Sequence, residues 1–72
     1  MITEAQATVK GLTEIWKSSG SKRQNLLAQD IVNDLQSKGV DAEVVDSSTR
    51  IGTIYSVWRD KAYVKRLRKE LF

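Results

Sequence analysis

The lysine and arginine residues of this sequence have the type and spacing that best suit a chemical role. That role is the binding of phosphate. Lysine and arginine give charge-assisted hydrogen bonds to phosphate oxygens, and arginine can give two in parallel. The 72-residue chain holds 12 such residues, and most of them fall in its last third. The candidate binding residues of that segment are Arg50, Arg59, Lys61, Lys65, Arg66, Arg68 and Lys69.

These residues divide into two predicted roles. The five basic residues from Lys61 to Lys69 are expected to contact phosphate, whereas Arg50 and Arg59 are the candidates for contacts near the bases. Arg50 follows three hydroxyl residues, 47–49, which suit contacts to the sugar–phosphate backbone. Lys22 and Arg23 are added as phosphate contacts, because they stand at the start of a predicted helix, where unpaired backbone amides attract anions.

The charge along the chain is uneven. Residues 1–40 hold five basic and four acidic groups (+1), residues 41–49 hold three acidic groups (−3), and residues 50–72 hold seven basic and two acidic groups (+5), which sum to the net charge of +3. Charge polarised in this way bears on partners and association rates rather than on the fold. A solvated helix face would produce the same pattern, so both interpretations stay open.

Catalysis is not expected, because the side chains that usually perform it are missing. The sequence has no histidine and no cysteine, and its four glycines stand apart, so it has no imidazole base, no thiolate and no glycine-rich phosphate loop. Ser47 and Ser48 suit a turn or a cap better than a nucleophile. The carboxylates are not spaced as a calcium loop requires. We therefore expect no enzyme activity, no metal and no cofactor.

An intracellular, cytoplasmic protein is expected. No apolar run approaches the ~20 residues of a membrane span, and the first residues, Met1 to Glu4, lack the basic and apolar regions of a signal peptide. A membrane is accordingly not among the expected partners. The length indicates a single small domain over residues 1–72.

The first half of the chain predicts an N-terminal helical hairpin. Thr3 and Gln6 have the spacing of a capping box, and apolar residues recur through Trp16 at helical intervals, so a helix is expected over residues 4–17. Ser21 begins a second helix, with an inner stripe of Leu27, Ile31 and Leu35. Its end is marked by Gly39, which is expected to adopt the left-handed conformation of a Schellman motif, with Val40 packed against Leu35.

Residues 41–58 allow two interpretations. β-Branched and aromatic residues favour a β-hairpin with strands near 41–45 and 51–58. Ile51, Ile54, Tyr55 and Trp58, however, also have the i, i+3, i+4, i+7 spacing of a helix. We favour the hairpin. Beyond it, a basic C-terminal helix is expected over residues 61–71, with Asp60 as its N-cap and an apolar seam of Val64, Leu67 and Leu71.

The expected fold class is therefore α+β: a helical hairpin, a β-hairpin and a basic C-terminal helix. The alternative is an all-α bundle with a helix-turn-helix-like unit. In that alternative, residues 49–60 resemble the recognition helix of small helix-turn-helix proteins, which implies groove-facing roles for Arg50, Thr53, Ser56 and Arg59. The preceding segment, 41–46, departs from that pattern because it is short and acidic and has no glycine.

Both folds lead to the same functional expectation, which is non-catalytic binding of nucleic acid, duplex DNA in particular. Such a protein would act as a small regulator of the transcriptional or phage/plasmid type, and a homodimer would let it bind two half-sites. The alternative is a protein-interaction module or small inhibitor that docks on a larger acidic partner. Trp16, Tyr55 and Trp58 are expected in the core, because this chain has few other large side chains to fill it.

Overall fold

Residues 1–61 are described by the computed structural model, and they form an α+β domain of two helices and a four-stranded mixed sheet. Nothing further is described for residues 62–72. The elements in chain order are β1 (Ile2–Thr3), α1 (Glu4–Val9), β2 (Leu12–Lys17), α2 (Lys22–Ser37), β3 (Ala42–Asp46) and β4 (Tyr55–Asp60).

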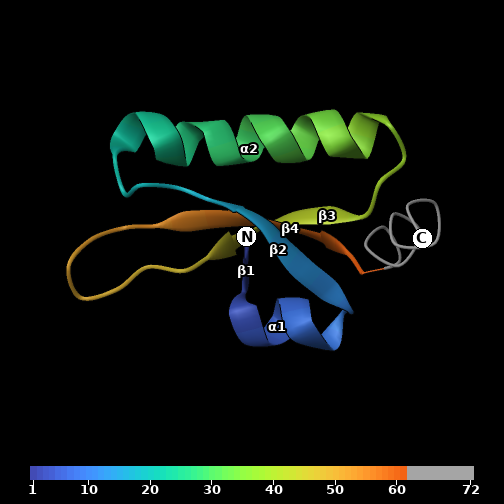
Figure 1. Ribbon diagram of the computed structural model, residues 1–72, viewed down its shortest axis with the longest axis horizontal. Coiled ribbons are helices and arrows are strands. Elements are labelled where there is room, and N and C mark those ends of the chain that lie inside the picture. The colour runs from blue at the N-terminus through green and yellow to red at the C-terminus, as the bar shows by residue number, and fades with distance from the viewer. Residues whose placement is uncertain (62–72) are drawn as a thin grey trace, which may run out of the picture.

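The sheet lies between the two helices, with α2 over one face and α1 over part of the other (Figure 1). Its strand order is β1-β3-β4-β2. Strand β1 pairs parallel with β3, whereas β4 pairs antiparallel with both β3 and β2. The strands adjacent in sequence, β1 and β2, therefore lie at opposite edges, and each helix carries the chain across one face of the sheet.

Helix α2 begins and ends where its local sequence predicts. The Ser21 hydroxyl accepts a hydrogen bond from the Gln24 amide at 3.1 Å, which caps the first turn. At the other end Gly39 has a φ of 77°, and the Val40 amide donates to the Leu35 carbonyl at 3.0 Å. The predicted Schellman motif is therefore confirmed.

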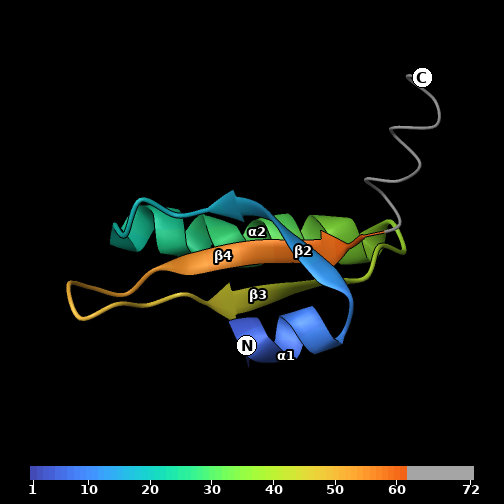
Figure 2. The ribbon, with the colours of Figure 1, turned by 60° about the horizontal axis from the view of Figure 1, so that its bottom comes forward.

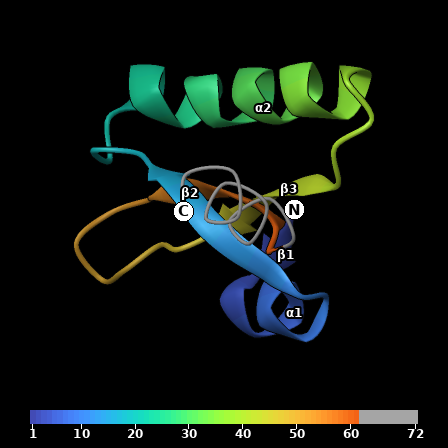
Figure 3. The same cartoon turned by 45° about the vertical axis from the view of Figure 1, so that its right-hand side comes forward.

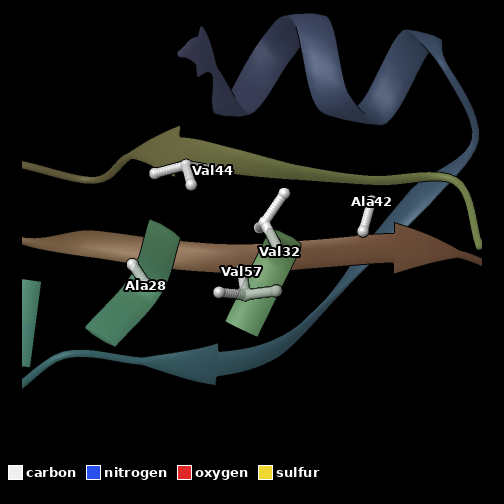
Figure 4. Packing of buried hydrophobic residues seen from close by; sticks show 5 residues of the cluster. All are labelled: Ala28, Val32, Ala42, Val44 and Val57. Carbon is white, nitrogen blue, oxygen red and sulfur yellow. The ribbon is translucent and has the colours of Figure 1, made fainter. Parts of the chain in front are cut away.

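The larger core lies between α2 and the sheet. Ala28 and Val32 of α2 meet Ala42, Val44 and Val57 of the two central strands (Figure 4), and all five side chains are buried. Small residues on both sides let the helix approach the sheet closely. Trp16 and Tyr55 pack around this cluster, partly buried, as core aromatic residues should.

A smaller core lies on the opposite face, under α1. Ala7, Leu12 and Val45 are buried there, and Ile2 and Trp58 pack against them. Figure 2 shows α1 on this side of the sheet, next to β3. The alternation of side chains along β4 explains why Val57 and Trp58 face different helices. The expectation that both tryptophans and Tyr55 belong to the core is confirmed.

The predicted N-terminal helical hairpin is wrong, because the first helix stops after Val9. The capping box at Thr3 is present, but Gly11 has a φ of 80°, a left-handed conformation that ends the helix and starts β2. In β2 the register against β4 shifts between Glu14 and Trp16. This bulge at Ile15 turns Trp16 towards α2, whereas strict alternation would place it on the face of Leu12.

The predicted β-hairpin is confirmed with shifted bounds: β3 has the predicted length of five residues, whereas β4 begins later, at Tyr55, and is shorter than predicted. Strands β3 and β4 pair in register from Ala42 opposite Arg59 to Asp46 opposite Tyr55. The helical alternative for residues 41–58 is wrong, and with it the resemblance to a helix-turn-helix recognition helix. The predicted C-terminal helix, 61–71, lies outside the described residues except for Lys61, which follows β4 and donates its amide to the Gly11 carbonyl at 3.1 Å.

The left-handed helix end at Gly39 predicts a specific stability difference between two glycines. Gly39→Ala should lower the free energy of unfolding by about 1 kcal/mol, because a Cβ disfavours positive φ. Gly52→Ala is the matched control: a Cβ there meets nothing within 4 Å and φ is not in the left-handed region, so we expect little loss. Urea denaturation of both variants measures the difference. Equal stability of the two variants would contradict the role of Gly39.

Candidate nucleic-acid interface

The hairpin loop between β3 and β4, residues 47–54, is a folded projection that we call the finger. The Ser47 amide donates to the Ile54 carbonyl at 2.9 Å, which extends the β3–β4 pairing by one step. Further out, Thr49 and Gly52 exchange two backbone hydrogen bonds of 3.0 and 3.3 Å. The finger is therefore a narrow ribbon, visible as the long loop on the left of Figure 1.

Side-chain oxygens brace the finger at three points. The Asp46 carboxylate accepts from the Ser48 amide at 3.0 Å, the Ser48 hydroxyl accepts from the Ile54 amide at 3.2 Å, and the Thr49 hydroxyl accepts from the Ile51 amide at 3.3 Å. Local bonds of this kind are how serine, threonine and aspartate hold turns. Side-chain and backbone hydrogen bonds from Ser48 stabilise the Asp46 carboxylate and lower its pKa.

The apex of the finger consists of Arg50 and Ile51, between the paired Thr49 and Gly52. Both residues are exposed, and Ile51 is 99% exposed. The finger therefore presents a guanidinium and a branched aliphatic side chain to solvent from adjacent positions of a hydrogen-bonded turn.

Asn25 of α2 anchors the base of the finger to the rest of the protein. Its amide nitrogen donates to the Thr53 carbonyl at 2.9 Å, and its amide oxygen accepts from the Tyr55 backbone amide at 3.3 Å and from the Ser18 hydroxyl. Ser18 in turn accepts from the Gly20 amide at 3.2 Å. One side chain thus joins the first turns of α2, the end of β2 and the finger.

This anchoring brings the start of α2 beside the finger, at the same end of the molecule (Figures 1 and 3). An open groove lies between them, lined by Gly20, Lys22, Asn25, Leu26, Thr53 and Tyr55. Lys22 and Arg23 are exposed in the first turn of α2, and Leu26 is 65% exposed one turn later. We call residues 18–26 together with the finger the finger end of the molecule.

The three cations of the finger end have no ion-pair partners among the described residues, whereas three of the four basic side chains at the opposite end have one. Lys22, Arg23 and Arg50 join no ion pair within residues 1–61. No acidic residue occurs in segments 18–26 or 47–54. At the opposite end the described ion pairs are Lys10–Glu43, Lys38–Asp34 and Arg59–Asp60. The finger end therefore combines three cations available to an external anion with the absence of acidic residues from its two segments, whereas Lys61, which also joins no ion pair within residues 1–61, directly follows Asp60.

The structure separates the predicted binding residues into groups rather than gathering them on one face. Arg50, Lys22 and Arg23 lie together at the finger end. Arg59 and Lys61 lie at the far end of β4, about 17 Å or more away for a six-residue strand. The Arg59 side chain is only 13% exposed and contacts Asp60 at 3.3 Å, which does not suit contact with a base. The remaining predicted contacts, Lys65, Arg66, Arg68 and Lys69, lie outside the described residues.

Sequence reasoning missed two residues of this region. Asn25 has no signal of its own, because its role depends on Thr53 and Tyr55, which are distant in sequence. Lys17 reaches the finger end because it pairs with Ser56, and it lines a second, polar groove with residues of α1 and the finger. Glu4 and Asp46 line the same groove, so the charge of Lys17 is offset locally.

A series of hydrogen bonds that runs from buried Ser56 to exposed Glu4 supports the finger on the face of the sheet that α1 covers. The buried Ser56 hydroxyl accepts from the Trp58 indole nitrogen at 2.9 Å and shares a 2.9 Å hydrogen bond with the Ser47 hydroxyl. The Ser47 hydroxyl also lies 2.9 Å from a carboxylate oxygen of Glu4. This series of hydrogen bonds fixes the first residue of the finger to the sheet and to α1.

The described part of the chain contains neither a cluster of metal-binding side chains nor a membrane-spanning helix. Residues 1–61 contain no group of three or more side chains placed to hold a metal ion, and no helix there is long and apolar enough to cross a membrane. No family model, curated protein or solved structure matches this chain. Function is therefore inferred from the geometry and charge of the finger end.

The anchoring role of Asn25 predicts a marked loss of stability when it is removed. Asn25→Ala should lower the free energy of unfolding by about 1–3 kcal/mol, because it leaves partly buried groups of Ser18 and Tyr55, and the exposed Thr53 carbonyl, without this partner. Asn33→Ala, on the exposed face of the same helix, is the matched control and should cost less than about 0.5 kcal/mol. Chemical denaturation monitored by tryptophan fluorescence measures both. Equal small losses would show that Asn25 is not the anchor.

Proposed function

We propose that this protein is a non-catalytic nucleic-acid-binding module that contacts duplex DNA through its finger end. The observation that carries the proposal is the set of three exposed cations, Lys22, Arg23 and Arg50, that join no ion pair among residues 1–61. Neutralising backbone phosphates with such cations releases condensed counterions, which drives binding with little dependence on base sequence.

The shape of the finger end supports this proposal. A ribbon that projects from the sheet can follow a groove of the duplex while cations on the neighbouring helix contact the phosphates of its rim. Serine and threonine hydroxyls at positions 48, 49 and 53 lie on the exposed finger, where they can add contacts to the sugar–phosphate backbone. The bound surface would thus combine positioning contacts from α2 with groove contacts from the finger.

A second candidate function is docking on an acidic partner protein. The exposed side chains of Leu26 and Ile51 stand among the finger-end cations, and apolar anchors with a charged rim also occur at protein interfaces. The same residues serve both functions, so the two differ in what the finger end binds rather than in where binding occurs.

Binding to duplex DNA at several salt concentrations tests the proposal. The full chain should bind random-sequence duplex, and log K should fall linearly with log salt. The double variant Lys22→Ala/Arg23→Ala should bind more weakly at every concentration, with a slope less steep by about 1.8, because about 0.9 counterion per phosphate contact is no longer released. Arg50→Ala should reduce the slope by about half that amount. Fluorescence anisotropy of a labelled duplex measures both quantities.

The matched control removes the same charge from the opposite end. Lys10→Ala/Lys38→Ala deletes two exposed lysines that pair with Glu43 and Asp34, and its slope should equal that of the unmodified protein. Lys65→Ala/Arg68→Ala in the same titration tests the contacts predicted for the C-terminal segment. No binding of the unmodified protein at low salt, or equal slopes for the finger-end and control variants, would contradict the proposal and direct attention to an acidic protein partner.

A further inference from the structure

We infer that Ile51 is an apolar wedge, which enters a base step of the duplex from the minor groove and bends the DNA away from the protein. This inference rests on the proposed function and adds a mode of binding to it. Its basis is the composition of the finger apex, where the most exposed aliphatic side chain of the described residues stands next to Arg50.

The chemistry of the apex suits insertion better than base recognition in the major groove. An isoleucine side chain has no hydrogen-bond donor or acceptor, so it cannot distinguish the base edges there beyond contact with a thymine methyl group. Aliphatic side chains that wedge between stacked base pairs are a recurrent device of minor-groove proteins, and arginine is the residue that favours the negative potential of that groove. At the apex, Ile51 is the aliphatic side chain that can wedge between base pairs, and Arg50 is the arginine that the minor groove attracts.

The finger is long enough for its apex to reach the floor of the minor groove. The apex residues lie four positions along the chain from the last β3–β4 pair, Asp46 opposite Tyr55, which is about 13 Å at about 3.3 Å per residue. The minor groove is about 7.5 Å deep. The apex can therefore touch the groove floor while the body of the protein stays outside, with Lys22 and Arg23 near the phosphate rim.

Hydrogen bonds also hold the finger in a fixed conformation, which insertion of Ile51 between base pairs requires. The paired backbones of Thr49 and Gly52 lie directly behind the apex, and Asn25 ties Thr53 to α2. A wedge on an unsupported loop would fold back rather than separate the bases. Here the turn is closed by two hydrogen bonds, and its base is joined to a 16-residue helix.

The test measures bending and binding separately on one duplex. A DNA of about 30 base pairs carries a donor and an acceptor dye at its ends; because it is much shorter than the persistence length of about 150 base pairs, it is nearly straight without protein. Energy transfer at saturating protein reports the bend, and anisotropy reports the affinity. The unmodified full chain should increase energy transfer. Ile51→Ala should abolish most of that increase and weaken binding roughly three- to tenfold, with an unchanged salt slope, because the wedge carries no charge. Ile51→Leu should retain the bend.

Val9→Ala is the matched control, since Val9 is an aliphatic residue 89% exposed on α1, away from the finger. It should bend DNA as the unmodified protein does. If the protein binds with the predicted salt slope but energy transfer does not change, or if Ile51→Ala bends DNA fully, the wedge is wrong and the proposed function stands. If the protein binds no DNA, both the proposed function and the wedge are wrong.

Discussion

The register of β3 against β4 is the constraint on which the rest of this structure depends. With Val44 opposite Val57, one face of the hairpin meets α2, and the other meets α1 through Val45 and Trp58. A slip of one residue would exchange the two faces and bury polar side chains. The same register places Ser47 opposite Ile54 and Thr49 opposite Gly52, and these pairs put Arg50 and Ile51 at the apex.

The architecture explains why the available positive charge is concentrated at one end. The hairpin and α2 both run along the long axis of the molecule, so their ends lie together at the finger end and at the opposite end (Figure 1). At the end opposite the finger, Lys10, Lys38 and Arg59 form ion pairs with carboxylates, and Lys61 directly follows Asp60. At the finger end, the loop after β2, the first turns of α2 and the finger contribute cations and amides but no acidic residue. Asn25 holds these three segments together, so stability and the candidate interface share one side chain.

Elements specified by local interactions were predictable from the sequence. The caps at Thr3 and Ser21 and the Schellman motif at Gly39 each depend on residues within six positions, and all three are present. The first helix was misjudged because Leu12 and Trp16 have helical spacing for a different reason. They lie on opposite faces of an edge strand with a bulge between them, and such a bulge removes the period of two that identifies a strand.

The candidate site was only partly predictable, because strands separate residues that are close in sequence. The sequence assigns Arg50 and Arg59 the same role, contact near the bases, yet β4 carries the chain from the finger end to the opposite end between them. Lys22 and Arg23 were treated as secondary, yet they lie beside the finger through the contact of Asn25 with Thr53, 28 residues away in sequence. Contacts of this range arise from the tertiary fold and leave no periodic signal.

Mapping the DNA-bound surface by amide chemical shifts is the sharpest test of the claim that the finger end is the interface. In a titration of the isotopically labelled full chain with a short duplex, we expect the shifts of residues 1–61 to change mainly within 18–26 and 47–54. Chemical-shift changes confined to the opposite end of the molecule, around Lys10, Lys38 and Arg59, with those of the finger unaffected, would contradict that claim.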